Sequence, residues 1–323
     1  MGANQNQTAR ARLKIEGIRD SLHYIDPVFL NSPQYACDEL SERLSAKMVL
    51  KDETQNPVRC FKGRGSEVLA SRHTDGRRIL CASAGNFGQA MAFSCGRRGI
   101  PVTVYASVNA SPIKLDRMRE LGADVVLHGE DFDAAKLKAK RVAATSDARF
   151  VEDALAIETV EGAGTMGLEL LEHPEPFDAL LIPLGNGAMF NGIGCVFKAL
   201  SPETEIIAVQ AQGAPAMIES WRSGRIVAHE RIETIADGIG VRTPIPEALE
   251  DMHDLIDDGM LVSEEGIREG MRLLKRHAGL TAEPSSAVGV AAILESDGRF
   301  SGKRIGIIIC GGNVSDEQIQ EWL

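Results

Sequence analysis

Short apolar runs alternate with amphipathic stretches from residue 48 onward. Six of the runs are nearly continuous and rich in aliphatic residues: 78–82, 102–106, 124–127, 179–184, 206–210 and 304–309. The stretches with apolar residues at helical spacing are 88–98, 112–121, 132–146, 162–172, 189–200, 264–278 and 284–295. Strands without polar alternation, separated by helices, are typical of parallel sheets that helices cover on both faces. The pattern therefore predicts an α/β fold.

The division into domains has to be inferred, because no repeat, low-complexity tract or long linker interrupts the chain. Residues 78–151 hold compact strand–helix units, and we expect them to form a small α/β domain. The large domain would then be discontinuous, built from residues 1–77 and 152–323. Ligands of open parallel sheets bind at the carboxyl ends of the strands, so the loops after the strands are the candidates for chemistry.

The composition narrows the classes of function. The 323 residues are 44% hydrophobic and 25% charged, the balance of a soluble globular protein. A formal net charge of −11 argues against nucleic acid or an anionic membrane as the main partner. The six cysteines show no Cys-x-x-Cys pair or metal-ligand spacing, which predicts a reducing, cytoplasmic setting and no metal site. No apolar run is long enough to span a membrane.

One lysine stands in a glycine-flanked stretch, residues 59–66, which reads Arg-Cys-Phe-Lys-Gly-Arg-Gly-Ser. Phe61 precedes Lys62 and small residues follow it, which would shield an amine beside flexible backbone. Such a setting suits a lysine that forms a Schiff base. The signal is weak alone, because most lysines next to a glycine are solvated turn residues.

Three loops after predicted strands add to this signal. Loop 83–89, Ser-Ala-Gly-Asn-Phe-Gly-Gln, leads into a helix whose free N–H groups can bind an anion. Loop 185–189, Gly-Asn-Gly-Ala-Met, favours a monophosphate, because the Walker A and G-x-G-x-x-G spacings are missing. The last strand ends in residues 310–314, Cys-Gly-Gly-Asn-Val, where the thiol alone would read as an inert buried residue. Asp237 and Glu283 lie in segments that read as ordinary turns.

In this order the motifs resemble those of the fold-type-II pyridoxal-phosphate enzymes, in the branch of serine/threonine dehydratases, phenylserine dehydratases and serine racemases. The branch's Ser-Phe-Lys-x-Arg-Gly corresponds to residues 60–65, and Ser-Ala/Ser-Gly-Asn-His-x-Gln corresponds to residues 83–89. Its tetraglycine loop corresponds more loosely to 185–189, and Ser-Gly-Gly-Asn-Val to 310–314. The resemblance covers residues 48–313. It implies two open, twisted, mostly parallel sheets in two lobes with pyridoxal 5′-phosphate between them, and it suggests a homodimer.

The resemblance also implies roles for single residues. Lys62 would hold the cofactor covalently and remove the Cα proton of the substrate. The other cofactor contacts would be Phe61, Asn86, Gly185, Asn186, Gly187, Ala188, Met189, Gly238 and Cys310. The substrate would be bound by Ser83, Ala84, Gly85, Asn86, Phe87 and Gln89. Asn86 would bond the ring hydroxyl, and Cys310 would face the ring nitrogen as a neutral thiol, which favours prompt loss of a β-substituent over transamination.

The implied reaction is the α,β-elimination of a 3-hydroxy-L-amino acid to a 2-oxo acid and ammonia. Ala84 stands where racemases of the branch have a serine, so racemisation is less expected. Gln210 and Ala216 stand at the branch's cation-site positions, which predicts an absent or weakened metal site. Phe87 replaces a histidine, either as a packing change or to suit an apolar β-substituent. The predicted substrate is L-threonine, L-serine or a bulkier 3-hydroxy amino acid such as L-threo-3-phenylserine.

Other interpretations stay open at this stage. Within the family they are β-replacement and serine racemase activity. From other classes, the chain could be an NAD(P)-dependent oxidoreductase, against which the missing dinucleotide fingerprint counts, or a catalytically silent ligand-binding protein.

Overall fold

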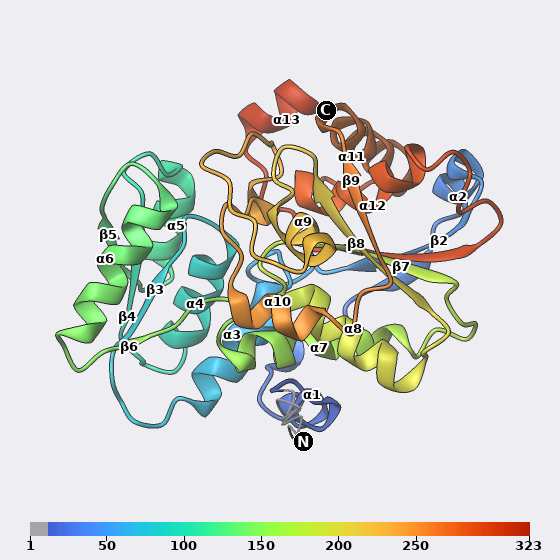
Figure 1. The fold of residues 1–323 in the computed structure, drawn as a ribbon. Coiled ribbons are helices and arrows are strands. Elements are labelled where there is room, and N and C mark those ends of the chain that lie inside the picture. The colour runs from blue at the N-terminus through green and yellow to red at the C-terminus, as the bar shows by residue number, and fades with distance from the viewer. Residues whose placement is uncertain (1–11) are drawn as a thin grey trace, which may run out of the picture.

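The computed structural model describes residues 12–323, so the first 11 residues of the predicted large domain lie outside the described part. Two sheets form its framework (Figure 1). One has six strands in the order β1 (Gln34–Ala36), β2 (Lys47–Asp52), β10 (Arg304–Ile309), β7 (Ala179–Pro183), β8 (Glu205–Ala211) and β9 (Asp258–Val262). The other has four in the order β5 (Asp124–Leu127), β4 (Val102–Ala106), β3 (Ile79–Ala82) and β6 (Arg149–Phe150). Only the β1–β2 pair is antiparallel.

Helices cover both sheets. They are α1 (Ile15–Ser21), α2 (Asp38–Leu44), α3 (Lys62–Arg72), α4 (Asn86–Gly96), α5 (Pro112–Glu120), α6 (Phe132–Ala144), α7 (Ile157–Leu170), α8 (Ala188–Leu200), α9 (Ala216–Ser223), α10 (Pro246–Met252), α11 (Glu264–Ala278), α12 (Pro284–Leu294) and α13 (Asp316–Trp322). Two 3₁₀ turns are η1 (Pro27–Phe29) and η2 (Asp237–Ile239). Among residues 12–323, no helix combines the length and the apolar character that crossing a membrane requires.

The large sheet is buried on both faces, as its apolar strands predict. Leu180 and Ile182 of β7 pack into the cluster that contains α7 and α8. Leu181, between them, packs into the opposite cluster with α11 and α12. Successive strand residues point to opposite faces, so a strand needs apolar residues at every position when helices cover both sides.

The predicted α/β class and the six predicted strands are confirmed. Strands β1, β6 and β9 and helices α1, α2, α3, α9, α10 and α13 were not predicted. The four strands of the small sheet all fall between residues 79 and 150, but the domain boundary at 78–151 stays a prediction.

The sequence predicts flexible backbone beside Lys62, but the glycines that follow Lys62 lie inside α3. Helix α3 packs directly on α7 at this point. A Cβ on Gly65 would lie 2.7 Å from the Cα of Thr159, and a Cβ on Gly162 would lie 2.6 Å from the Cα of Gly65. The glycines therefore let two helix backbones approach each other, and the prediction of flexible backbone is wrong.

We expect Gly65→Ala to lower the free energy of unfolding by about 1–3 kcal/mol, because backbone atoms of α7 cannot move aside for the new methyl group. An alanine for a glycine in a helix otherwise stabilises by roughly 1 kcal/mol. Gly194→Ala in α8 is the control, since a Cβ there would come no closer than 3.1 Å to another atom, the side-chain Cβ of Leu255. Urea unfolding of both variants measures the difference, and equal stability would contradict the backbone contact.

Candidate active site

A cleft of about 640 Å³ lies at the carboxyl ends of the strands, between the loops that follow β3, β6, β7 and β10. The structure brings nearly all of the predicted site residues to this cleft: Phe61, Lys62, Ser83, Ala84, Gly85, Asn86, Phe87, Gly185, Asn186, Gly187, Ala188, Met189, Gly238 and Cys310. Gln89 is different, because it is buried within α4 and does not line the cleft. Asp153, Lys114 and Glu283 line it as well.

Lys62 is the first residue of α3. Its Nζ lies 2.5 Å from Oδ2 of Asp153 and 4.3 Å from the centroid of the Phe61 ring. The backbone N–H of Phe61 donates to the carbonyl of Cys310 at 3.0 Å, which ties the start of α3 to the end of β10. The lysine therefore stands on a fixed element at the strand ends, with an aromatic ring and a carboxylate beside its amine.

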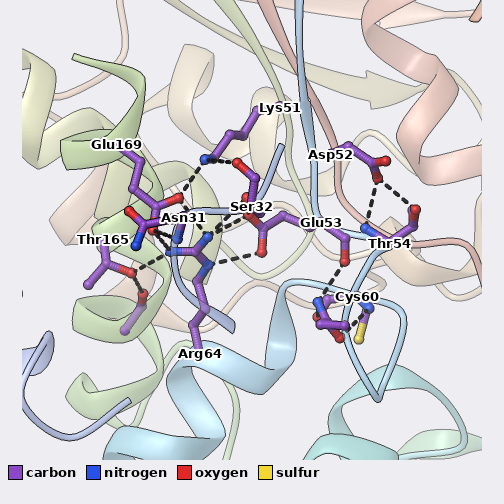
Figure 2. Close-up of polar contacts among 12 residues, drawn as sticks. Asn31, Ser32, Lys51, Asp52, Glu53, Thr54, Cys60, Arg64, Thr165 and Glu169 are labelled. Carbon is purple, nitrogen blue, oxygen red and sulfur yellow. Dashed lines mark hydrogen bonds and ion pairs between the residues drawn. The ribbon is translucent and has the colours of Figure 1, made fainter. Parts of the chain in front are cut away.

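A buried ion-pair network around Arg64 holds the first turn of α3 (Figure 2). Arg64 is fully buried. Its Nε and Nη2 donate to the carboxylate of Glu53 at 2.9 and 2.7 Å. Its Nη1 and Nη2 donate to the carboxylate of Glu169 on α7 at 2.6 and 2.9 Å. Lys51 of β2 donates to the same Glu169 at 2.5 Å, so two cations face two anions.

The network depends on complete pairing. Guanidinium forks match carboxylates in two parallel hydrogen bonds, and Arg64 makes this contact twice. Removing one partner of a buried pair typically costs about 3–5 kcal/mol, because the other charge is left without compensation. Burial opposes ionisation of Glu169, but the hydrogen bonds and charge of Arg64, together with Lys51, lower the pKa of Glu169 to about 2.

The loop between β7 and α8 has the shape of a phosphate site. Gly187 has φ +102°, a left-handed conformation that favours glycine, and it turns the chain into α8. The first N–H groups of this 13-residue helix have no acceptor within the helix and lie at its positive end. A Cβ on Gly185 would come within 3.3 Å of the Gly238 carbonyl, so the loop closes tightly. These residues fit the phosphate of pyridoxal phosphate.

At the other side of the cleft, the motif loops 83–89 and 310–314 meet through Glu283. The amide nitrogen of Asn86 donates to both carboxylate oxygens of Glu283 at 2.9 Å, and the backbone N–H of Asn313 donates to Oε1 at 2.9 Å. Asn313 also donates through its side chain to Oδ1 of Asn86 at 2.8 Å. Burial raises the pKa of Glu283 despite these donors. The sequence suggested an ordinary turn at Glu283, whereas the structure shows that Glu283 fixes Asn86.

Cys310 is buried at the end of β10, with its Sγ 3.4 Å from the hydroxyl of Ser286. Burial, followed by the nearby charge of Glu283, raises the pKa of the Cys310 thiol to about 12. The thiol is therefore neutral at physiological pH. That it faces the ring nitrogen of the cofactor stays a prediction.

Two ion pairs connect the helices of the small sheet with segments beside the large one. Nζ of Lys114 on α5 lies 2.9 Å from Oδ2 of Asp237, and Nε of Arg242 donates to Asp133 on α6 at 2.8 Å. All four residues line the cleft. These pairs bridge the cleft and hold its two sides together. Asp237 therefore has a structural partner, as a turn carboxylate often does.

The positions expected to lack a cation site lie near α9. Oε1 of Gln210 accepts from the N–H of Ile218 at 2.9 Å, and Ala216 begins the helix. Within the described part of the chain, no three His, Cys, Asp or Glu side chains gather closely enough to hold a metal ion. The loss of metal binding remains a prediction about the protein in solution.

These features agree with one class of protein: two sheets, a lysine at the strand ends, and a loop that fits a phosphate group. The family model described as "Pyridoxal-phosphate dependent enzyme" matches residues 25–311, and the chain belongs to this family. The predicted cofactor, pyridoxal phosphate, is confirmed, and so is the enzyme class that depends on it. The family assignment also sets aside the NAD(P)-dependent oxidoreductase.

Several relatives are similar over most of the chain. The L-threonine ammonia-lyase of Thermotoga maritima is 32% identical over 310 residues, which are 95% of this chain and 77% of that protein. The catabolic L-threonine dehydratase of Escherichia coli K12 is 30% identical over 286 residues, 87% of either chain. Among solved structures, maize serine racemase has a TM-score of 0.89 at 26% identity and covers 97% of both chains. The resemblance to the dehydratase and racemase branch is confirmed, and the relatives' names include both activities.

The lowered pKa of Glu169 predicts how the stability of the fold changes at acid pH. Its pKa is about 2 in the folded protein against an ordinary value of 4.5, so it stabilises the fold above pH 4.5 and loses this effect as the pH falls toward 2. We expect Glu169→Gln to be less stable than the wild type at pH 6, with the difference shrinking steadily below pH 4.5. Urea unfolding at several pH values measures it, with the exposed Glu172→Gln as the control. A constant difference at all pH values would contradict the assignment.

Proposed function

We propose that the protein is a pyridoxal-phosphate-dependent ammonia-lyase that eliminates water from a 3-hydroxy-L-amino acid and releases a 2-oxo acid and ammonia. The observation that carries the proposal is the position of Lys62 at the strand ends, on the same cleft as loop 185–189, which fits a phosphate group, and loop 83–89, which carries Asn86. The names of the relatives support it, because the threonine dehydratases among them match most of the chain. Pyridoxal phosphate supplies an electron sink for the pair left when the Cα–H bond breaks.

The chain's own groups have separate tasks in this proposal. The N–H groups at the start of α8 hold the phosphate, and Lys62 takes the Cα proton. The substrate carboxylate lies against the start of α4, whose first N–H groups are free to bind an anion. Because the Cys310 thiol is neutral, it places no negative charge beside the ring, which favours loss of the β-substituent over transamination. Asn86, held by Glu283, serves the ring hydroxyl.

Elimination is favoured over racemisation by the residue at position 84. A racemase needs a second group that returns a proton to the other face of Cα. Ala84 occupies the position where the resemblance places that group, and its methyl cannot carry a proton. The proposed activity is therefore a dehydratase without racemase activity, and β-replacement would require a second nucleophilic substrate.

L-Threonine and L-serine are the first candidate substrates, as the relatives' names suggest. Phe87 is 7% exposed and packs with Leu69 and Met91, which supports the interpretation as a packing change. It also lines the cleft, as Phe61 does. This apolar wall makes L-threo-3-phenylserine the second candidate.

Ammonia release from L-serine, L-threonine, L-threo-3-phenylserine, 3-hydroxyaspartate and D-serine tests the proposal. We expect release from at least one L-3-hydroxy amino acid without a second substrate, and no conversion of L-serine to D-serine by chiral analysis. Lys62→Ala should lose turnover by at least about 10²-fold and should not retain the cofactor after borohydride treatment. Lys140→Ala, a half-exposed lysine that pairs with Glu152, is the control. No release from any 3-hydroxy amino acid would refute the proposal.

A further inference from the structure

A carboxylate that belongs to none of the motifs touches the catalytic lysine. Oδ2 of Asp153 lies 2.5 Å from Nζ of Lys62, although the two residues are 91 positions apart in the chain. The second oxygen, Oδ1, is buried without a hydrogen-bond partner among the described residues. Asp153 lines the cleft, as Lys62 does. Because Oδ1 is enclosed by protein, a molecule in the cleft can reach the carboxylate at Oδ2, the oxygen that already holds the amine.

The backbone around Asp153 is fixed in a costly conformation. The next residue, Ala154, has φ +67°, the left-handed region that costs a residue with a Cβ roughly 1–2 kcal/mol. One local and one distant contact hold it there: the Ala154 N–H donates to the hydroxyl of Thr159 at 3.0 Å, and Arg12 donates to the Ala154 carbonyl at 2.8 Å. Val151 is tied to β3 by its N–H, which donates to the Leu80 carbonyl at 2.8 Å. Strain of this kind is commonly found at functional sites.

Four other carboxylates on the cleft have different partners. Glu152, next in the chain, pairs with Lys136 and Lys140 at 3.1 and 2.6 Å. Asp237 pairs with Lys114, Asp133 with Arg242, and Glu283 with Asn86. Of these carboxylates, Asp153 is the one in contact with Lys62. An acid-base role next to the lysine therefore falls to this residue.

We propose that Asp153 is a second catalytic residue, which binds the β-hydroxyl of the substrate and passes to it the proton that Lys62 removes from Cα. This inference rests on the proposed elimination. A hydroxyl is a poor leaving group and has to receive a proton as the Cβ–O bond breaks. Oδ2 is bonded to the amine that gains the proton, and its second lone pair can accept a hydrogen bond from that hydroxyl.

The step balances without another reactant. The Cα–H bond breaks and its proton goes to Nζ of Lys62, whose hydrogen bond to Asp153 passes a proton to the carboxylate. The carboxylic acid then gives this proton to the β-oxygen as the Cβ–O bond breaks, so water leaves. The electron pair of the Cα–H bond becomes the Cα–Cβ double bond. Lys62 and Asp153 return to their starting protonation states, and the enamine product hydrolyses to the 2-oxo acid and ammonia.

Substrates with different leaving groups separate this role from a structural one. Asp153→Asn keeps the shape of the side chain and a hydrogen-bond acceptor but cannot carry the proton. We expect its kcat on the preferred 3-hydroxy amino acid to fall by about 10²–10⁴-fold. On β-chloro-L-alanine the fall should stay below about tenfold, because chloride leaves without a proton. Glu152→Gln, which removes the neighbouring carboxylate, should lose little on either substrate.

Two further measurements keep the outcome clear. Circular dichroism and the absorbance of bound cofactor show whether Asp153→Asn folds and loads like the wild type, and we expect both to be unchanged. Asp153→Glu, which restores a carboxylate, should recover part of the activity on the hydroxy substrate. An equal loss on both leaving groups, or a variant that no longer binds the cofactor, would overturn the inference and leave Asp153 with a structural role. Failure of the wild type on every 3-hydroxy amino acid would instead overturn the proposed function.

Discussion

The pairing of Arg64 with two carboxylates determines where Lys62 stands. Arg64 lies one residue beyond the glycine that follows Lys62, and it joins the first turn of α3 to Glu53 after β2 and to Glu169 on α7. The α7 helix begins just after the Asp153 loop, and Thr159 in its first turn holds the backbone of that loop. Lys62, at the start of α3, and the Asp153 loop, which leads into α7, are therefore held by two helices that the same network locks together.

A buried network of this kind is a costly way to stabilise a fold, since two cations and two anions must leave water. Its advantage is geometric. Apolar packing tolerates small sliding of one helix on another, whereas a guanidinium with both edges bonded accepts one arrangement. The glycine contact between Gly65 and Gly162 acts in the same direction, because two backbones in direct contact leave no side chain that can repack. A shift of about 1 Å between α3 and α7 could stretch the 2.5 Å contact between Lys62 and Asp153 to the limit of a hydrogen bond.

Much of the fold could be predicted because a sheet covered on both faces demands continuous apolar strands, as in β7 and β10. The loops at 83–89, 185–189 and 310–314 could be found because they follow such strands. Helix α3 was missed, since Lys-Gly-Arg-Gly-Ser has poor intrinsic helix propensity and is helical through tertiary contacts. Asp153 and Glu283 were missed as site residues because their partners are distant in sequence. Gln89 was predicted to bind substrate from the motif alone, but α4 places its side chain in the protein interior.

The contact between Lys62 and Asp153 also bears on why one fold supports both elimination and racemisation. In the proposed elimination these two groups, 2.5 Å apart, would lie on the same side of a bound substrate. A proton taken from Cα by such a pair would have a short route to the β-oxygen and no route to the opposite face of Cα, where the resemblance places Ala84. A racemase needs two separate proton carriers on opposite faces, and it gains nothing from an acid coupled to the first. Under the proposed role of Asp153, its placement by a strained turn before α7 would favour elimination before any difference in substrate binding.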